Sequence, residues 1–143
     1  MPDPADVLIE RVGKADSRVL DCVAEDVFDA PISAAHLAAY LAQPNQLMCV
    51  AVHDGVVVGQ ARAVVHLRPD KPPELFIDNA GVAPAFQRRG IARRLLTEVI
   101  AWGRDRGCVE VWVGTELDNA PALALYRSLG LKPQQMVMLD GTL

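Results

Sequence analysis

Hydrophobic side chains recur along this sequence at two spacings, one typical of strands and the other typical of helices. In the first third, the pattern predicts a short strand over 7–12 and a helix over 16–28. Ser33 favours the start of a second helix that runs to Leu41, because its hydroxyl can accept a hydrogen bond from the first helical turn. The chain is therefore expected to begin with a strand followed by two helices.

The middle of the chain predicts three consecutive strands. Residues 46–53 and 56–67 are rich in β-branched side chains. The dipeptide Asp54-Gly55 between them supplies the positive φ angles that a two-residue hairpin turn needs. A further strand is predicted over 74–82.

The last third alternates between helix and strand. Residues 88–106 form a long amphipathic helical pattern. A strand is predicted over 109–114, a helix over 119–129 and a closing strand over 135–139. The full order, βααβββαβαβ, indicates a single mixed α/β domain over 1–143.

The charge of the chain is unevenly distributed. Its 143 residues carry a formal net charge of −4 and are 51% hydrophobic, which suits a globular domain with its own core. Residues 87–106 hold six arginines against Glu98 and Asp105. One basic segment in an acidic protein indicates a local anion site, because a nucleic-acid binder needs a broad positive surface.

Three cysteines, Cys22, Cys49 and Cys108, are widely spaced, and no histidine accompanies them at metal-ligand spacing. This pattern is typical of reduced thiols in an intracellular protein and predicts no bound metal. The amino terminus lacks the features of an export signal, and no apolar run approaches the ~18 residues of a membrane span. We expect a cytoplasmic protein that does not enter a membrane.

The segment before the long helix carries the clearest chemistry. A helix N-terminus offers unpaired N–H groups and the positive end of a dipole, both of which favour phosphate. Small residues admit a diphosphate, and arginines add charge. No P-loop or dinucleotide-binding glycine motif is present. The alternative is a solvated, arginine-rich helix start. The candidate ligands of a diphosphate are Gln87, Arg88, Arg89, Gly90, Ile91 and Ala92.

Two blocks of this sequence resemble the signatures of the GNAT family of N-acetyltransferases. The first, Val82 to Leu96 (VAPAFQRRGIARRLL), contains the Gln-x-x-Gly-x-Ala pattern of acetyl-coenzyme A binding, and the second is Asn119 to Leu131 (NAPALALYRSLGL). They occur in the order and spacing of the family. The resemblance implies a GNAT fold with a mixed, mostly antiparallel sheet, acetyl-coenzyme A as co-substrate and N-acetyltransferase activity.

The resemblance also implies where the acetyl donor lies. The strands over 74–82 and 109–114 are expected to splay apart around the pantetheine arm. Independently of the resemblance, a glycine inside an otherwise good strand predicts a β-bulge or a close backbone approach at Gly81. A bulge would free the backbone groups of Ala80 and Val82 to bind that arm.

Three residue roles follow from the same resemblance. The N–H of Val82 is expected to stabilise the oxyanion, and the hydroxyl of Tyr126 to protonate the departing thiolate. Tyr126 has the alternative role of packing between helix and sheet. Asn119 is expected to bond the coenzyme arm, to cap its helix, or to do both.

The base that takes the proton of the acceptor amine is left open. Glu74 and Asp78 are the candidates, because strand alternation places them on one face. The same carboxylates are suited to bind a cationic acceptor instead, and a water relay is the third alternative. His53 and His66 lie beside turns, where satisfied or solvated histidines are expected.

The acceptor is expected to be a primary amine of a small molecule. The two blocks look closest to the branch of the family that includes aminoglycoside 3-N-acetyltransferases, although Asn79 stands where that branch has an acidic residue. Transfer is expected to be direct, with no acetyl-cysteine at Cys108. The alternatives are a protein or peptide amine, a catalytically silent coenzyme A sensor, and an α/β domain that binds nucleic acid or a partner through its arginine helix. A free edge strand is compatible with a homodimer.

Overall fold

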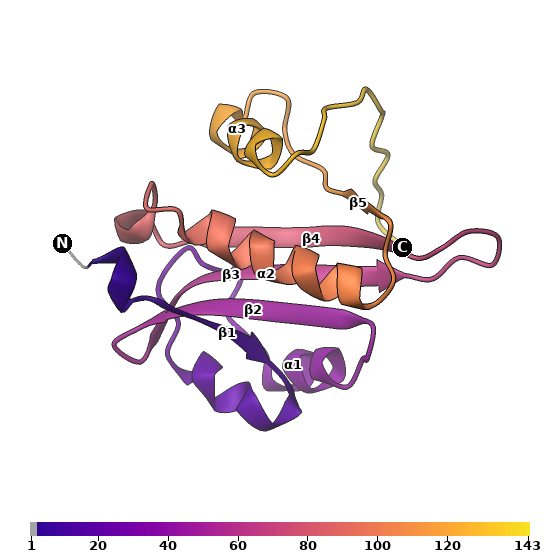
Figure 1. Ribbon diagram of the computed structural model, residues 1–143. Coiled ribbons are helices and arrows are strands. Elements are labelled where there is room, and N and C mark those ends of the chain that lie inside the picture. The colour runs from indigo at the N-terminus through magenta and orange to yellow at the C-terminus, as the bar shows by residue number, and fades with distance from the viewer. Residues whose placement is uncertain (1–2) are drawn as a thin grey trace.

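The computed structural model describes residues 3–143, whose strands form one five-stranded sheet (Figure 1). The strand order is β1-β2-β3-β4-β5. The first four strands pair antiparallel, and β5 pairs parallel to β4, so the predicted mixed sheet is confirmed. The strands are β1 (Leu8–Val12), β2 (Gln46–His53), β3 (Val56–His66), β4 (Glu74–Val82) and β5 (Glu110–Trp112). The helices are α1 (Ala34–Leu41), α2 (Ile91–Asp105) and α3 (Ala120–Ser128), with 3-10 helices η1 (Pro4–Asp6), η2 (Lys14–Asp21) and η3 (Pro84–Phe86).

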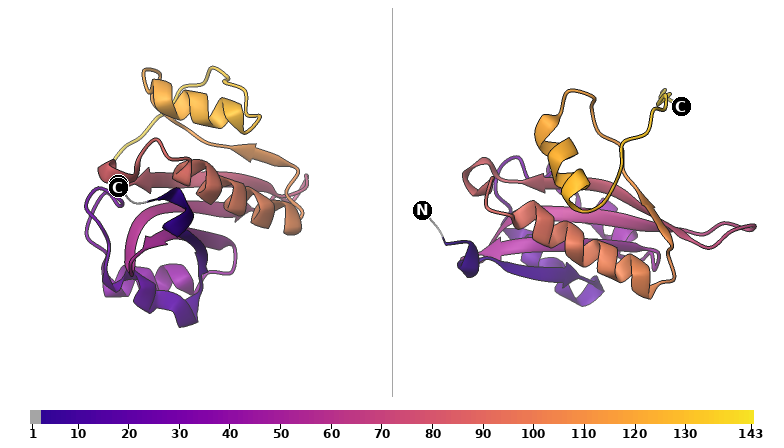
Figure 2. Two further views of the ribbon diagram at one scale, coloured as in Figure 1. Left: turned by 60° about the vertical axis from the view of Figure 1, so that its left-hand side comes forward. Right: turned by 45° about the horizontal axis from the view of Figure 1, so that its top comes forward.

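Helix α2 covers one face of the sheet, and α1 lies with η2 on the other face (Figures 1 and 2). Strand β3 contributes to both faces, because neighbouring residues of a strand point in opposite directions. A Cβ atom at Gly59 would lie 3.2 Å from Leu95 of α2. Arg62 instead lines a cavity with residues of α1. From Gly59 onward, odd-numbered residues of β3 therefore face α2 and even-numbered residues face α1.

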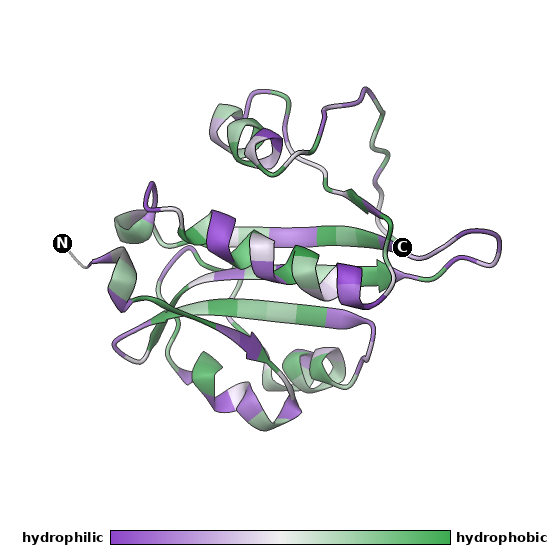
Figure 3. Cartoon of the chain, viewed as in Figure 1, coloured by the Kyte–Doolittle hydropathy of each residue, from purple (hydrophilic) through white to green (hydrophobic). Residues whose placement is uncertain are grey.

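The core lies mainly between the sheet and α2. Figure 3 shows hydrophobic residues along the centre of β2, and α2 packs on the sheet through Ile91, Leu95, Leu96 and Val99, none of them more than 1% exposed. The last turns of α2 approach β4 most closely at Gly103, where a Cβ atom would lie 2.8 Å from the Leu75 side chain. The absence of a side chain at Gly103 makes room for Leu75 of β4.

Strand β4 contains a β-bulge at Asp78. Arg62 of β3 pairs with Asn79, and the next residue, Ala63, pairs with Ile77. Asp78 is therefore an extra residue that opposes no residue of its own on β3. A bulge of this kind bends the strand and redirects the side chains that follow it.

The prediction of a bulge at Gly81 is wrong, because Gly81 pairs regularly with Gln60, and Ala80 pairs with Ala61. The alternative expectation for this glycine, a close approach of the backbone, is confirmed. A Cβ atom at this position would lie 2.6 Å from the carbonyl oxygen of Val27. The chain between η2 and α1 thus crosses β4 at a distance that only glycine permits.

The helix predicted over 16–28 is also wrong in its second half. The 3-10 helix η2 ends at Asp21, and the backbone then bonds to β3 instead of continuing as a helix. Val57 donates to the Cys22 carbonyl, and Ala24 donates to the Val57 carbonyl, both at 2.9 Å. The apolar residues at helical spacing are Val19, Leu20, Val23 and Val27. Leu20 and Val27 are buried and the other two are partly buried, Val23 in the bridge to Val57 of β3.

The strand predicted over 135–139 is absent, and residues 131–143 have no regular secondary structure. Strand β5 is only three residues long, so it offers little edge for a neighbour to pair with. Met136, Val137, Met138 and Leu139 are each at least 74% exposed. β-propensity alone therefore does not order this segment without a partner strand.

The other predicted elements are present with small shifts at their ends. Ser33 caps α1 as expected, because its hydroxyl accepts a hydrogen bond from the N–H of His36 at 3.3 Å. The long helix begins at Ile91 rather than near 88, and the strand predicted over 109–114 is confined to β5.

Candidate active site

Strand β4 extends well beyond β5, and this difference in length opens the sheet. The two strands pair only along β5, and the last pair is Phe76 and Trp112, whose rings stack with centroids 4.2 Å apart. Strand β4 continues to Val82. Within the described part of the chain, residues 77–82 have no strand partner on the β5 side. Ala80 and Val82, the predicted pantetheine ligands, lie in this open half.

The chain leaves β4 through η3 and reaches the N-terminus of α2 in a turn with two left-handed residues. Arg88 has a φ of +62° and Gly90 a φ of +75°. Gly90 is the N-cap of α2 and has no side chain to bond the N–H groups of the first turn. Turns of this kind direct successive N–H groups toward an anion, and the helix dipole adds to the attraction.

Two side chains fix the turn to its surroundings. Gln87 Nε2 donates to the Val82 carbonyl at 3.0 Å, which joins the turn to the end of β4. The Arg89 guanidinium lies 5.6 Å from the centroid of the Phe86 ring. Ile91 is only 1% exposed, so this residue is available to a ligand through its backbone alone.

Helix α3 lies on the side of the sheet that β5 leaves open (Figures 1 and 2). Arg93 Nη1 of α2 donates to the Ser128 carbonyl of α3 at 3.2 Å, which links the two helices. Asn119 caps α3, since its Oδ1 accepts from the N–H of Ala122 at 3.2 Å. Tyr126 is half-buried, and burial raises the pKa of its hydroxyl. The hydroxyl therefore stays protonated at neutral pH.

Glu74 lies at the beginning of β4, within a charged cluster. Its carboxylate contacts His66 Nδ1 at 2.8 Å and Arg68 Nη1 at 3.2 Å. The hydrogen bond from His66, with the nearby charge of Arg68, lowers the pKa of Glu74. A carboxylate with a lowered pKa is a weaker base.

Asp78 lies at the bulge, in the half of β4 that β5 leaves open. Its Oδ2 is 3.7 Å from Nε of Arg62, and 45% of its side chain is exposed. Asp78 is therefore accessible to a ligand, whereas only 16% of the Glu74 side chain is exposed. The structure does not bring the two candidate carboxylates into one cluster, because each has its own cationic partner on β3 or the loop that follows it.

The contacts of His53, His66 and Cys108 are those of structural residues. The His53 ring packs against Phe86 with centroids 5.3 Å apart, and His66 is bound to Glu74. Burial raises the pKa of the Cys108 thiol, which disfavours a nucleophilic thiolate. Among residues 3–143, no group of three or more side chains is arranged to hold a metal ion.

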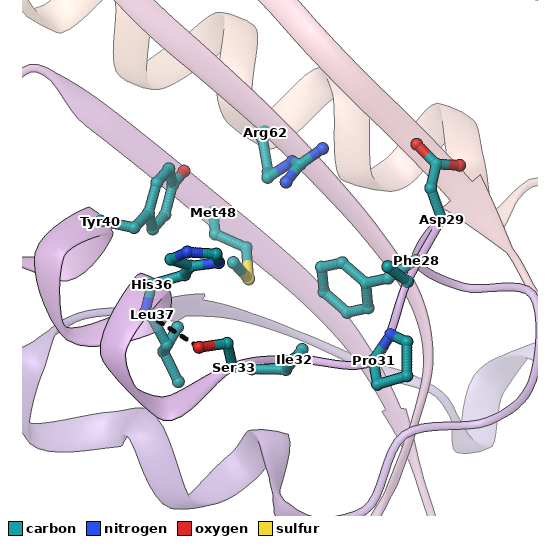
Figure 4. A pocket seen from close by; sticks show the side chains of 11 residues that line it. Phe28, Asp29, Pro31, Ile32, Ser33, His36, Leu37, Tyr40, Met48 and Arg62 are labelled. Carbon is teal, nitrogen blue, oxygen red and sulfur yellow. Dashed lines mark hydrogen bonds between the residues drawn. The ribbon is translucent and has the colours of Figure 1, made fainter.

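A cavity of about 410 Å³ lies on the α1 face of the sheet (Figure 4). The sequence signals this cavity only weakly, through Gln60 and Arg62, the two polar residues inside the otherwise apolar run of 56–65. The cavity is lined by Phe28, Asp29, Ala30, Pro31, Ile32, Ser33, His36, Leu37, Tyr40, Met48 and Arg62. We call it the α1-face cavity.

Comparison with known proteins shows the family of this chain. The model of the acetyltransferase (GNAT) family matches residues 18–131, which is most of the sequence. The chain belongs to the GNAT family. The predicted N-acetyltransferase class, with acetyl-coenzyme A as the acetyl donor, is thereby confirmed.

Individual GNAT relatives differ in their acceptors. The chain is 29% identical over 111 residues to an aminoglycoside N(6')-acetyltransferase type 1 from Salmonella typhimurium, covering 75% of this chain and 70% of the relative. It is 41% identical over 106 residues to the N-alpha-acetyltransferase RimI from Mycobacterium tuberculosis, covering 74% of this chain and 65% of the relative.

A solved GNAT structure resembles nearly the whole chain. It is AAC(6')-Iy in complex with the bisubstrate analog CoA-S-monomethyl-acetylneamine, with a TM-score of 0.78, 25% identity, and coverage of 95% of this chain and 97% of the other. These aminoglycoside relatives are 6'-acetyltransferases, so the predicted likeness to the 3-N branch is not confirmed. Among the described residues, no helix has the length and apolar content to cross a bilayer.

Proposed function

We propose that this GNAT enzyme acetylates a primary amine of a small molecule by direct transfer from acetyl-coenzyme A. One observation carries the proposal. The half of β4 without a strand partner leads through η3 to the N-terminus of α2, which has no side-chain cap, so free backbone groups for an extended chain are followed by a site for phosphate.

The donor is proposed to lie along this route. Its pyrophosphate would meet the backbone of the turn at Gln87, Arg88, Arg89, Gly90, Ile91 and Ala92. Its pantetheine arm would lie against Ala80 and Val82, with Asn119 beside it as a second role to its capping bond. The acetyl group, which is carried at the end of this arm, would then lie beside the open half of β4.

The nitrogen of an ammonium acceptor loses two protons in the transfer, one before and one after its attack, and the departing sulfur gains one. The amine attacks the thioester carbon, and the Val82 N–H is proposed to stabilise the oxyanion that forms. When the carbon–sulfur bond breaks, Tyr126 is proposed to donate its proton to the sulfur and to regain one from the second proton that the nitrogen releases, through solvent. Asp78 is proposed to receive the ammonium group and to accept its proton, directly or through water. Glu74 is the weaker candidate because it is held by His66 and Arg68.

Relatives named as aminoglycoside acetyltransferases make aminoglycoside amines natural members of the acceptor panel. The test is a thiol-release assay with acetyl-coenzyme A and aminoglycosides, polyamines, amino acids or short peptides, together with calorimetry of coenzyme A binding. Amine-dependent release with a small amine supports the proposal. Tight coenzyme A binding without release from any amine, or release with peptides alone, would overturn it. A homodimer remains a prediction that sedimentation of the same sample tests.

A further inference from the structure

The α1-face cavity has an apolar wall and a polar wall. Figure 4 shows the rings of Phe28 and Pro31 with Ile32 on one side and Tyr40 with Arg62 on the other, with Met48 between them. The polar side chains of His36, Ser33 and Asp29 also line the cavity. The Arg62 guanidinium also lies 5.9 Å from the centroid of the Phe28 ring. A ligand group in this cavity would therefore meet hydrocarbon on one side and hydrogen-bond donors on the other.

The two donors on the polar wall have no hydrogen-bond partner within the described chain. They are the Tyr40 hydroxyl and Nε of Arg62, both inaccessible to solvent. The contact of Arg62 with Asp78, at 3.7 Å, is an ion pair too long for a hydrogen bond. Burial raises the pKa of Tyr40 to about 12, so its hydroxyl keeps its proton at neutral pH. Buried donors without partners in a folded protein require an explanation. A ligand oxygen that pairs with them is one, once the side chains that cover the two atoms move to admit it.

The cavity is also placed next to the reacting centre. Met48, Arg62 and Asn79 form one row across β2, β3 and β4. Asn79 belongs to the half of β4 that β5 leaves open, and the bulge residue Asp78 precedes it. Arg62 lines the cavity and lies 3.7 Å from Oδ2 of Asp78, so an amine held at Asp78 would have its remaining atoms beside the Arg62 side of the cavity.

We propose that the α1-face cavity binds an apolar substituent and a carboxylate or carbonyl oxygen of the acceptor, so that the acceptor is an amine of the α-amino acid type. This inference rests on the function proposed above. The amine would lie at Asp78, the oxygen at Tyr40 and Arg62, and the apolar side chain against Phe28 and Met48. Arg62 would repel a second ammonium group at the oxygen site itself, whereas the Asp29 carboxylate, which also lines the cavity, would attract one.

Matched amines test the oxygen site. Phenylalanine, phenylalaninamide and phenethylamine share one apolar body and differ in carrying a carboxylate, a neutral carbonyl or neither, and leucine offers a parallel set. We expect kcat/KM to fall at least about tenfold from the carboxylate or amide to the amine without oxygen. A preference for the carboxylate indicates a free amino acid. If kcat/KM for phenylalaninamide and for a phenylalanyl dipeptide both match or exceed the value for phenylalanine, the acceptor carries a neutral carbonyl at this site, as a peptide does.

Tyr40→Phe is the decisive variant, because it removes only a hydroxyl that has no partner in the free protein. Its thermal stability should equal or exceed that of the wild type. We expect kcat/KM to fall about tenfold for the oxygen-bearing amines and to stay unchanged for phenethylamine.

Equal kcat/KM for the three matched amines, or an equal loss for all three in Tyr40→Phe, would overturn this inference. Turnover of aminoglycosides or polyamines, with none for either matched set, would overturn the inference and leave the proposed function standing. Coenzyme A binding with no turnover of any amine would overturn the proposed function itself.

Discussion

The amide of Gln60 donates a hydrogen bond to Oδ1 of Asn79 at 2.6 Å, although Gln60 is entirely buried. Its second amide hydrogen is directed to the Val27 carbonyl at 3.2 Å. One side chain thus joins three parts of the molecule: the centre of β3, the residue after the bulge of β4, and the segment that leads to the α1-face cavity. The positions of Asp78 and of this cavity both depend on it.

Gln60→Met tests this connection with little change in volume. The two acceptors lose their buried donor, so we expect the free energy of unfolding to fall by about 1–3 kcal/mol, measured by urea denaturation. Gln134→Met, at an exposed position without regular structure, is the control and should stay within about 0.5 kcal/mol of the wild type. If both variants had equal stability, Gln60 would not hold these segments together.

Gly81→Ala tests the close approach of the backbone. The new Cβ would lie 2.6 Å from the Val27 carbonyl oxygen, so the crossing segment must shift. We expect a loss of about 1–3 kcal/mol in the free energy of unfolding. Gly114→Ala is the matched control, because no atom lies within 4 Å of the added carbon. A Gly81→Ala protein as stable as Gly114→Ala would contradict the contact.

Local patterns predicted most of the fold because the interactions they describe are local. The turn at Asp54-Gly55, the cap at Ser33 and the amphipathic face of α2 each depend on neighbours within a few residues. The failures involve partners distant in sequence. Residues after Asp21 leave the helix because Val57 supplies backbone hydrogen bonds, and residues 135–139 remain irregular because β5 is short.

The candidate site divides in the same way. The turn before α2 has a sequence signature, so its position was predictable. A glycine inside a strand predicts a bulge at Gly81, because glycine often marks one. The register of β3 and β4 shows that the bulge lies at Asp78. The α1-face cavity combines residues 28–40 with Met48 and Arg62, and no local pattern predicts how the helical segment packs across the two strands.

The pair Asp78→Asn and Glu74→Gln separates the two candidate carboxylates. Asp78 is exposed in the open half of β4, so its loss should lower kcat/KM for the amine about tenfold to a hundredfold. The KM for acetyl-coenzyme A should not change. Glu74 is held by His66 and Arg68, so Glu74→Gln should retain nearly full turnover. Steady-state kinetics with both substrates varied measures these effects. A large loss in Glu74→Gln with little change in Asp78→Asn would assign the role of general base to Glu74.

Tyr126→Phe removes the proposed proton donor and leaves the ring in place. We expect kcat to fall about a hundredfold or more, with coenzyme A binding unchanged by calorimetry. Transfer requires the protonated hydroxyl, and burial raises the pKa of Tyr126 above the ordinary value of about 10. The wild-type rate should therefore decline on the alkaline side only above that value, as a pH profile of kcat would record. An unchanged kcat in the variant would leave Tyr126 with a packing role.

The central claim, direct transfer of acetyl from acetyl-coenzyme A to an amine, is tested by one rapid-mixing measurement of thiol release in the absence and presence of acceptor, followed by intact mass of the protein. We expect no release before the amine is added, an unmodified protein, and release that matches the acetylated amine one for one. Cys108→Ala should behave identically. A burst of thiol equal to the enzyme concentration without amine, accompanied by an acetylated protein, would contradict the claim, and so would the absence of release with every amine.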